Sequence, residues 1–142
     1  MTIRPAQARD LPVILQMLRG ANLPSQGVSE HLDTFLVAQS DTEIVGTIGL
    51  ELYGDIGLLR SAAVRESHRS SGVGTLLYEH LRELATSQGV QSLVLLTTTA
   101  EKYFAKKGFA TIDPKPLTGS ILTSSEFTGA CPSTAVCMEQ KL

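Results

Sequence analysis

The spacing of apolar residues changes several times along this chain, and each change marks a predicted element. Residues 2–4 are typical of a short first strand. Apolar positions over 13–18 then recur at the spacing of an amphipathic helix, for which Asp10 is a good N-cap and Gly20 a good terminator. Ser29 is expected to cap a second, short helix.

The pattern next becomes that of a sheet. Residues 35–39, 43–53 and 55–64 are rich in β-branched and apolar side chains, with polar breaks at 40–41 and 54–55. Such runs predict three consecutive antiparallel strands joined by tight turns.

The helical period returns at Val73 and lasts until Gly89. The apolar face predicted for this helix consists of Val73, Leu76, Leu77, Leu81, Leu84 and Ala85. Polar residues lie mostly opposite, so the helix is expected to cover one face of the sheet.

The last third of the chain predicts a buried strand over 91–97, a short helix over 100–107 and a strand that begins at Phe109. Residues 114–132 are rich in Pro, Gly, Ser and Thr, which predicts irregular structure, and 137–141 predicts a closing strand. The complete order predicts an α/β fold, a mixed sheet covered by helices.

Composition narrows the class of protein. A chain of 142 residues is expected to form a single domain, residues 1–142, because domains hold roughly 100–200 residues. Hydrophobic residues make up 42% and charged residues 18%, which excludes a disordered polyelectrolyte. The net charge of −2, without a basic stripe, argues against a nucleic-acid partner.

Localisation and metal chemistry follow from simple counts. No apolar run approaches the ~20 residues of a membrane-spanning helix, and we expect a cytoplasmic protein without a membrane partner. The three histidines are scattered and no Cys-x-x-Cys pair occurs, so no metal site is expected. Cys131 and Cys137 are expected to be reduced thiols.

The segment over 61–75 carries the most chemistry, because a strand there leads through a glycine-rich turn into a helix. Unpaired N–H groups and the positive end of the helix dipole suit a phosphate, and Arg69 adds a cation. A P-loop needs a lysine after its second glycine, where this chain has Thr75. A dinucleotide-binding fingerprint needs a third small residue, where this chain has Leu77, so the sequence argues against both motifs. From the residues alone, a phosphate site and a glycine pair that only begins a helix both stay open.

Three motifs resemble the GCN5-related N-acetyltransferase (GNAT) family. Residues 69–74 resemble its R/Q-x-x-G-x-G/A signature for the CoA pyrophosphate, and 62–64 stand where its fourth strand contacts pantetheine. Residues 103–109 are similar to its segment of two aromatic residues followed by Gly-Phe. The element order is similar as well, so the resemblance spans nearly the whole chain.

The resemblance implies a GNAT-like fold, in which a central, mostly antiparallel sheet is flanked by helices and splays open at a CoA cleft. It implies acetyl-CoA as cosubstrate and a homodimer. The residues implied in acetyl-CoA binding are Ala62, Ala63, Val64, Arg69, Ser70, Ser71, Gly72, Val73, Gly74, Thr75, Thr97 and Phe104.

For catalysis, the resemblance places the backbone N–H of Ala62 at the thioester oxygen, where negative charge develops. Glu51 is the best-placed carboxylate to accept a proton from the amine, unless it is only a solvated charge at the end of a strand. The tyrosine that many family members use as an acid is replaced by Phe104, and its neighbour Tyr103 points ~100° away on a helix. Tyr103, another donor or water therefore serves as the acid.

Two residues are expected at the acceptor. Arg60 lies in an apolar strand and shares strand parity with Ala62 and Val64, so it contacts a substrate carboxylate or forms a structural ion pair. Ser29 lies in the helical segment that helps to build acceptor pockets in similar proteins. The N-acetylglutamate synthases of this family carry basic residues before the strand that begins here at Phe35. Residues 26–31 contain no Lys or Arg, so this departure from the resemblance argues against glutamate as the acceptor.

Within the family, three segments look like narrower groups, over 58–61, 95–100 and 126–133. The first two resemble both N-acetylglutamate synthases and the stand-alone acetyltransferases of arsenic-resistance operons, and the third resembles the stand-alone group. The resemblance implies N-acetylation of a small amino acid or amino-acid-like compound, including detoxification of arsinothricin or phosphinothricin. A non-catalytic CoA sensor and a protein-lysine acetyltransferase are the alternatives.

Overall fold

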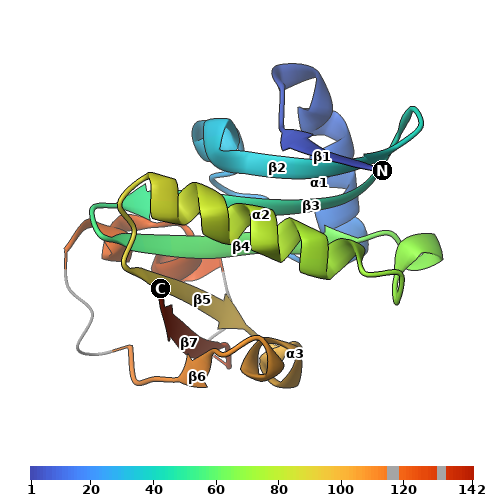
Figure 1. The fold of residues 1–142 in the computed structure, drawn as a ribbon. Coiled ribbons are helices and arrows are strands. Elements are labelled where there is room, and N and C mark those ends of the chain that lie inside the picture. The colour runs from blue at the N-terminus through green and yellow to red at the C-terminus, as the bar shows by residue number, and fades with distance from the viewer. Residues whose placement is uncertain (115–118, 131–133) are drawn as a thin grey trace.

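A twisted sheet forms the centre of the molecule (Figure 1). The computed structural model describes residues 1–114, 119–130 and 134–142. The sheet has seven strands in the order β1-β2-β3-β4-β5-β7-β6. Their bounds are β1 Thr2–Pro5, β2 Phe35–Ser40, β3 Glu43–Tyr53, β4 Ile56–Val64, β5 Ser92–Thr97, β6 Ala110–Thr111 and β7 Val136–Lys141.

Pairing is antiparallel throughout the sheet except between β4 and β5. These two strands pair in parallel over 56–58 and 92–94, and their remaining residues have no register partners on each other. The sheet therefore splays open in its middle. This arrangement confirms the expected mixed, mostly antiparallel sheet with a cleft.

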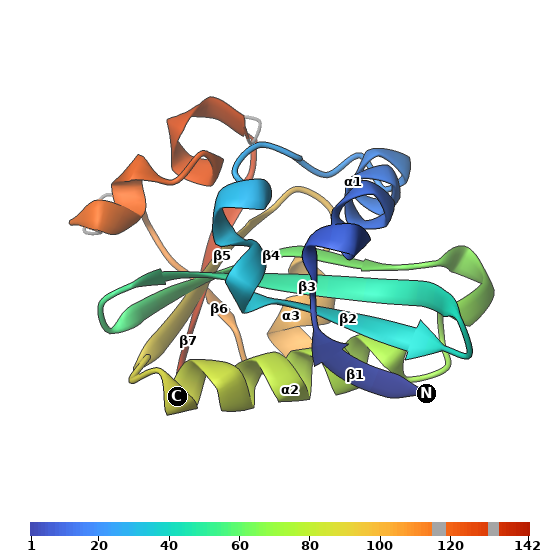
Figure 2. The same ribbon diagram turned by 90° about the horizontal axis from the view of Figure 1, so that it is seen from above.

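Helices cover both faces of the sheet (Figure 2). Their bounds are α1 Leu11–Gly20, α2 Val73–Ser87 and α3 Glu101–Lys106, and short helical turns lie at Ala8–Asp10, Ser29–Thr34, Glu66–His68, Ser120–Thr123 and Glu126–Ala130. α2 runs along one face, whereas α1 and the two turns after residue 119 lie on the other. Within the described residues, no helix has the length and apolar character needed to cross a membrane.

The core is divided between these faces. Under α2, Leu77, Leu81 and Ala85 pack with Leu50 and Leu93 of the sheet. The α1 face holds a second cluster of Ile14, Met17, Leu18, Val28, Phe35, Val37 and Ile44. The turns after residue 119 add a third cluster of Leu58, Val94, Ile121 and Cys137.

One prediction about the helix residues is wrong, and a second is confirmed only in its position. Leu76 was expected on the apolar face of α2, but 41% of it is exposed, because the buried stripe runs through Val73, Leu77 and Leu81. Asp10 is the N-cap residue of α1, as expected, but its side chain makes no hydrogen bond to cap this helix. Its carboxylate instead accepts hydrogen bonds from the Gln7 backbone N–H and from the Arg4 guanidinium.

A β-bulge in β4 reverses the predicted direction of Arg60. Ser61 has a φ of 58°, and the register moves from Arg60 opposite Gly49 to Ala63 opposite Thr47. Three residue steps on β4 thus match two on β3, which inserts one extra residue. Arg60 consequently lies on the face of Ala63, on the α1 side, and not with Ala62 and Val64 as strand parity predicted.

Candidate active site

The cleft between β4 and β5 contains two cavities that meet at residues 62–64. The first has a volume of about 320 Å³ and opens toward α2 and α3. The second has a volume of about 280 Å³ and is bounded by 21–24, β5 and Glu126. Within the described sheet, Ser61 and Ala62 have no register partner on β3 or β5, so the bulge leaves this stretch of β4 exposed to the cleft.

The first cavity lies at the N-terminus of α2. Gly72 precedes this helix in the left-handed conformation, with a φ of 88°, which glycine adopts without steric strain. A Cβ built on Gly72 would meet no atom within 4 Å, so the backbone is open to a ligand at this point. Arg69 lies at the rim, where its Nε donates to the Val64 carbonyl at 3.1 Å. Together they form a site where N–H groups, helix dipole and guanidinium favour an anion.

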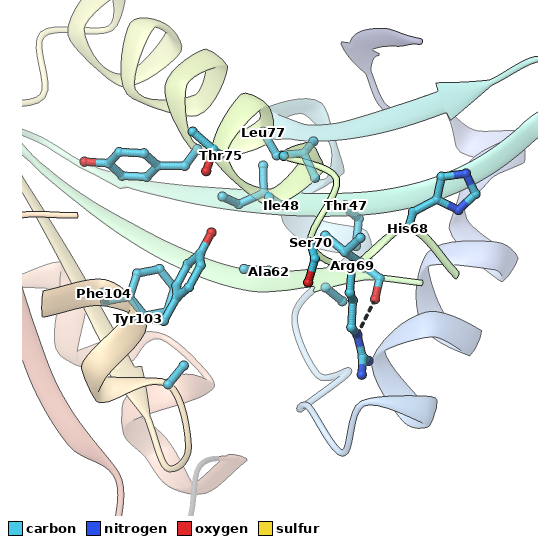
Figure 3. A pocket seen from close by; sticks show the side chains of 16 residues that line it. Thr47, Ile48, Ala62, His68, Arg69, Ser70, Thr75, Leu77, Tyr103 and Phe104 are labelled. Carbon is cyan, nitrogen blue, oxygen red and sulfur yellow. Dashed lines mark hydrogen bonds between the residues drawn. The ribbon is translucent and has the colours of Figure 1, made fainter. Parts of the chain in front are cut away.

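Side chains from opposite sides line this cavity (Figure 3). Tyr103 and Phe104 of α3 lie on one side, Arg69 and Ser70 on the other, and Ala62 of β4 lies between them. The cavity brings together most residues that the resemblance implied in acetyl-CoA binding: Ala62, Ala63, Val64, Arg69, Ser70, Gly72, Gly74, Thr75 and Phe104.

Three of the implied cofactor residues lie elsewhere. Val73 is 1% exposed and packs in the core under α2. Ser71 is exposed, and its hydroxyl donates to the His68 carbonyl. Thr97 lines the second cavity, where its hydroxyl accepts the backbone N–H of Ala100 at 3.0 Å. These side chains do not line the first cavity.

The two aromatic residues of α3, Tyr103 and Phe104, differ in how deeply they are buried. Phe104 is 7% exposed and packs edge-on against Phe109, whereas Tyr103 is 44% exposed. The Tyr103 hydroxyl lies against α2, since a Cβ built on Gly74 would be 2.9 Å from its oxygen. The Lys107 ammonium lies 5.5 Å from the Tyr103 ring centroid. Tyr103 is thus the residue of the pair that places a hydroxyl at the cavity.

Several lining residues were not predicted from the sequence. Thr47, Ile48, Leu77, Tyr78 and Ala100 line the first cavity, and His68 lies at its rim. None of these residues belongs to a motif that marks a CoA site in the sequence, and their place at the cavity depends on which residues the splayed sheet exposes.

The second cavity has a more polar wall. Arg60, Glu126 and Asn22 line it together with Thr98 and Thr99. Glu126 was noted in the sequence only as part of a family resemblance, because its distance from Arg60 along the chain hid their proximity in space. Ser29 lines neither cavity; it is exposed, and its hydroxyl donates to the Glu30 carboxylate at 3.1 Å.

Arg60 forms a buried ion pair with Glu51. The Arg60 Nη1 lies 2.7 Å from the Glu51 Oε2, and their side chains are 0% and 1% exposed. This contact confirms the structural ion pair that was one of the two alternatives for Arg60. Glu51 is not a solvated charge at a strand end, and it lines neither cavity.

Hydrogen bonds keep Glu51 ionised in this buried position. Burial alone would raise the pKa of Glu51, but hydrogen bonds from Tyr53, Arg60 and Ser124 outweigh it, so the pKa lies below its ordinary value of 4.5. Burial, and then the Glu51 carboxylate, raise the pKa of Tyr53 to about 12. His31 adds a further contact, with its Nε2 3.6 Å from Glu51 Oε1.

Neither Cys137 nor any described group of His, Cys, Asp and Glu side chains adds thiol or metal chemistry to the site. Cys137 is 3% exposed, and burial raises the pKa of its thiol to about 11. Cys131 lies outside the described residues. Within 1–114, 119–130 and 134–142, no group of three His, Cys, Asp or Glu side chains could hold a metal ion.

Comparisons with known proteins agree with this geometry. The family model described as an acetyltransferase (GNAT) domain matches residues 31–111. An amino-acid acetyltransferase from Pasteurella multocida is 28% identical over 119 residues, which cover 76% of this chain. The same match covers 27% of that relative, so the chain spans about a quarter of its length.

Two solved structures share the fold. Rv2747 from Mycobacterium tuberculosis, in complex with CoA and NLQ, has a TM-score of 0.82 at 22% identity and covers 100% of this chain and 99% of its own. N-acetylglutamate synthase from Neisseria gonorrhoeae, complexed with coenzyme A and N-acetyl-glutamate, has a TM-score of 0.85 at 22% identity. That match covers 99% of this chain and 35% of the synthase.

Proposed function

The chain belongs to the GNAT family of acetyltransferases, and from this premise we propose that it transfers the acetyl group of acetyl-CoA to the primary amine of a small amino acid or amino-acid-like compound. The observation that carries the proposal is the junction of two cavities at residues 62–64. One cavity suits an anionic cosubstrate, and the other gives a second, polar substrate access to the same strand. The solved relatives that hold CoA, and the relatives named amino-acid acetyltransferases, support this assignment.

Acetyl-CoA fits the first cavity by its chemistry. The pyrophosphate would bind the N–H groups of the first turn of α2, with Gly72 and Gly74 leaving room and Arg69 supplying a cation. The pantetheine arm would run along Ala62 and Val64, whose strand is not covered there by β5. Acetyl-CoA supplies the activated acetyl group, and the protein supplies its orientation.

We assign the transfer step to the bulged segment. The neutral amine attacks the thioester carbon from the second cavity, so that a C–N bond forms and the C–S bond breaks. The backbone N–H of Ala62 stabilises the negative charge that develops on the carbonyl oxygen. The attacking nitrogen becomes positively charged when the C–N bond forms, and it loses one proton to solvent. The Tyr103 hydroxyl is the candidate to protonate the departing sulfur because Tyr103 borders the first cavity, and solvent then returns a proton to Tyr103.

Glu51 does not carry the base role in this proposal. Its carboxylate is buried and accepts hydrogen bonds from Arg60, Tyr53 and Ser124, so it faces neither substrate. Water in the open second cavity would relay the proton instead.

An acceptor screen tests the proposed function. Acetyl-CoA would be incubated with a panel of amino acids, arsinothricin, phosphinothricin and lysine-containing peptides, with thiol release as the signal and mass spectrometry of the product. Amine-dependent thiol release and an N-acetylated small product are expected. Tight CoA binding without turnover would favour the sensor, and turnover on peptides alone would favour a protein-lysine acetyltransferase. The detoxification role, the homodimer and the cytoplasmic location stay predictions.

A further inference from the structure

The ion pair of Arg60 and Glu51 lies where segments outside the sheet converge on β4. Resting on the proposed function, we propose that Arg60 is a positioning residue for the acceptor. It holds together the segments 21–28 and 124–126, of which residues 21–24 and Glu126 wall the second cavity, and it does not itself bind the acceptor's carboxylate. We call the contacts of Arg60 with these two segments and with Glu51 the clamp.

All three nitrogens of the Arg60 guanidinium contact oxygens of the protein. Nε donates to the Ser61 hydroxyl at 3.1 Å, and Nη1 to the Glu51 carboxylate at 2.7 Å and the Ser125 hydroxyl at 3.4 Å. Nη2 donates to the Pro24 carbonyl at 3.2 Å. The side chain is 0% exposed, so these contacts direct the guanidinium fork at the protein.

The turn at 124–126 contacts the ion pair through three consecutive residues. Ser124 hydrogen-bonds to Glu51, Ser125 accepts from Arg60, and the Glu126 Oε2 lies 3.7 Å from the Arg60 Nη2. The Ser125 hydroxyl also donates to the Gln26 carbonyl at 3.0 Å. Segments 99 residues apart in the sequence are therefore tied to one guanidinium and to each other.

Gly27 completes this contact. Its φ of 82° is in the left-handed region, and a Cβ built on it would be 3.0 Å from the Arg60 Nη1 and 2.9 Å from the Ser125 Oγ. The backbone at Gly27 thus packs directly on the guanidinium. A side chain here would disturb the clamp without removing any of its charges, and this makes Gly27 a useful probe.

The segments that the clamp joins line the second cavity, on the acceptor side of the cleft, and do not line the first cavity. Residues 21–24 and Glu126 wall the second cavity, whereas neither segment lines the first. Figure 2 shows the chain after α1 beside the orange-red turns that follow residue 119. Displacement of these walls would alter acceptor binding and spare acetyl-CoA binding.

Steady-state kinetics with the best acceptor from the screen test the proposal. Arg60→Lys keeps a charge opposite Glu51 but loses the fork, and Gly27→Ala disturbs the same contact from the loop. Both are expected to raise the acceptor KM at least about tenfold, with the KM for acetyl-CoA within about threefold. Gly54→Ala is the matched control, since Gly54 has a φ of 68° and no neighbour within 4 Å of a Cβ. An unchanged acceptor KM in both clamp variants would overturn the proposal.

A comparison of two acceptors separates positioning from direct recognition. The amino acid and its amide differ in the carboxylate, and their kcat/KM ratio reports how strongly it is recognised. A clamp predicts that Arg60→Lys and Gly27→Ala leave this ratio unchanged. A ratio that falls in Arg60→Lys but not in Gly27→Ala would identify Arg60 as the carboxylate's ligand and refute the clamp.

Hydrogen exchange tests the clamp without any acceptor, so a failed screen would not decide it. In the wild type, the amides of Leu23, Phe127 and Thr128 donate to carbonyls of the chain. Both clamp variants are expected to exchange faster at these amides and to keep the protection of β2 and β3. Unaltered exchange at these amides would refute the clamp, as would equal loss of protection across the whole sheet.

Discussion

At the scale of single residues, the buried charges decide how this protein responds to pH. Glu51 has a folded-state pKa below the ordinary 4.5, so its ionised form stabilises the fold above that pH. The contribution is lost as the pH falls from about 4.5 through the lowered folded-state value. Asp10, with a pKa lowered first by its hydrogen bond from Arg4, acts in the same direction.

The first prediction concerns Glu51→Gln. Removal of this charge leaves Arg60 buried without its closest partner, and the free energy of unfolding at pH 7 is expected to fall by about 3–5 kcal/mol. Its decline between pH 5 and pH 3 should be shallower than in the wild type. Urea denaturation at several pH values measures both. Glu79→Gln, at an exposed position of α2, should change stability by less than about 0.5 kcal/mol.

The second prediction concerns Cys137. Because its thiol is buried and its pKa is raised to about 11, it should not react with a thiol reagent at pH 8 in the folded protein. The measurement uses a Cys131→Ser background, in which any labelling reports Cys137. Labelling should become rapid in denaturing urea, and rapid labelling of the native protein would contradict the buried position.

The sequence could predict that a residue needs a partner, because that depends on the residue type. It could not predict which residues are the partners when they lie far apart in the chain. The sequence indicated that Arg60 needs a partner or a ligand, since an arginine in an apolar strand is costly. It could not indicate that Glu51, Ser125 and Pro24 all meet it, because those contacts join three separate segments.

At the scale of elements, the bulge in β4 explains the main error of the strand prediction. Alternation assumes a regular strand, and Ser61 carries no signal that it adopts a positive φ. The other strands and helices follow from their apolar periods. The strand expected to begin at Phe109 is present as the short β6, Ala110–Thr111. The exceptions are the helical turns after residue 119, where the composition predicted only irregular structure.

The third prediction compares two glycines at opposite ends of α2. Gly72 and Gly89 both have positive φ values, 88° and 81°, and neither Cβ would meet an atom within 4 Å. Alanine at either position should lower stability by about 1–2 kcal/mol, the steric cost of the left-handed conformation. Only Gly72→Ala should also raise the Kd for CoA, by about tenfold or more. Titration calorimetry with CoA measures the Kd of both variants. Equal Kd values would contradict the placement of the anion site at the start of α2.

At the scale of the whole molecule, the cleft links ligand binding to stability. A ligand that binds only the folded state at a concentration of 100 times its Kd contributes about 2.7 kcal/mol. The fourth prediction is therefore that saturating CoA raises the Tm by about 5–10 °C. A thermal melt with and without CoA measures it. Arg69→Ala should show a smaller rise at the same CoA concentration, and an equal rise would place CoA elsewhere.

The mixed sheet with helices on both faces was predictable as a whole, because the order of elements limits how they can pack. The cavities were predictable only in part. The turn at 69–74 marks the first cavity, but the second depends on turns in a segment whose composition predicted only irregular structure.

The place of β7 between β5 and β6 has a consequence for biosynthesis. Every residue of β5 has a register partner on β7, yet β7 is made last of all the strands. A nascent chain on the ribosome therefore lacks the partner of β5, which leaves an open strand edge in the middle of its future sheet. Chains that stop before residue 136 should remain incompletely folded and bind chaperones or each other.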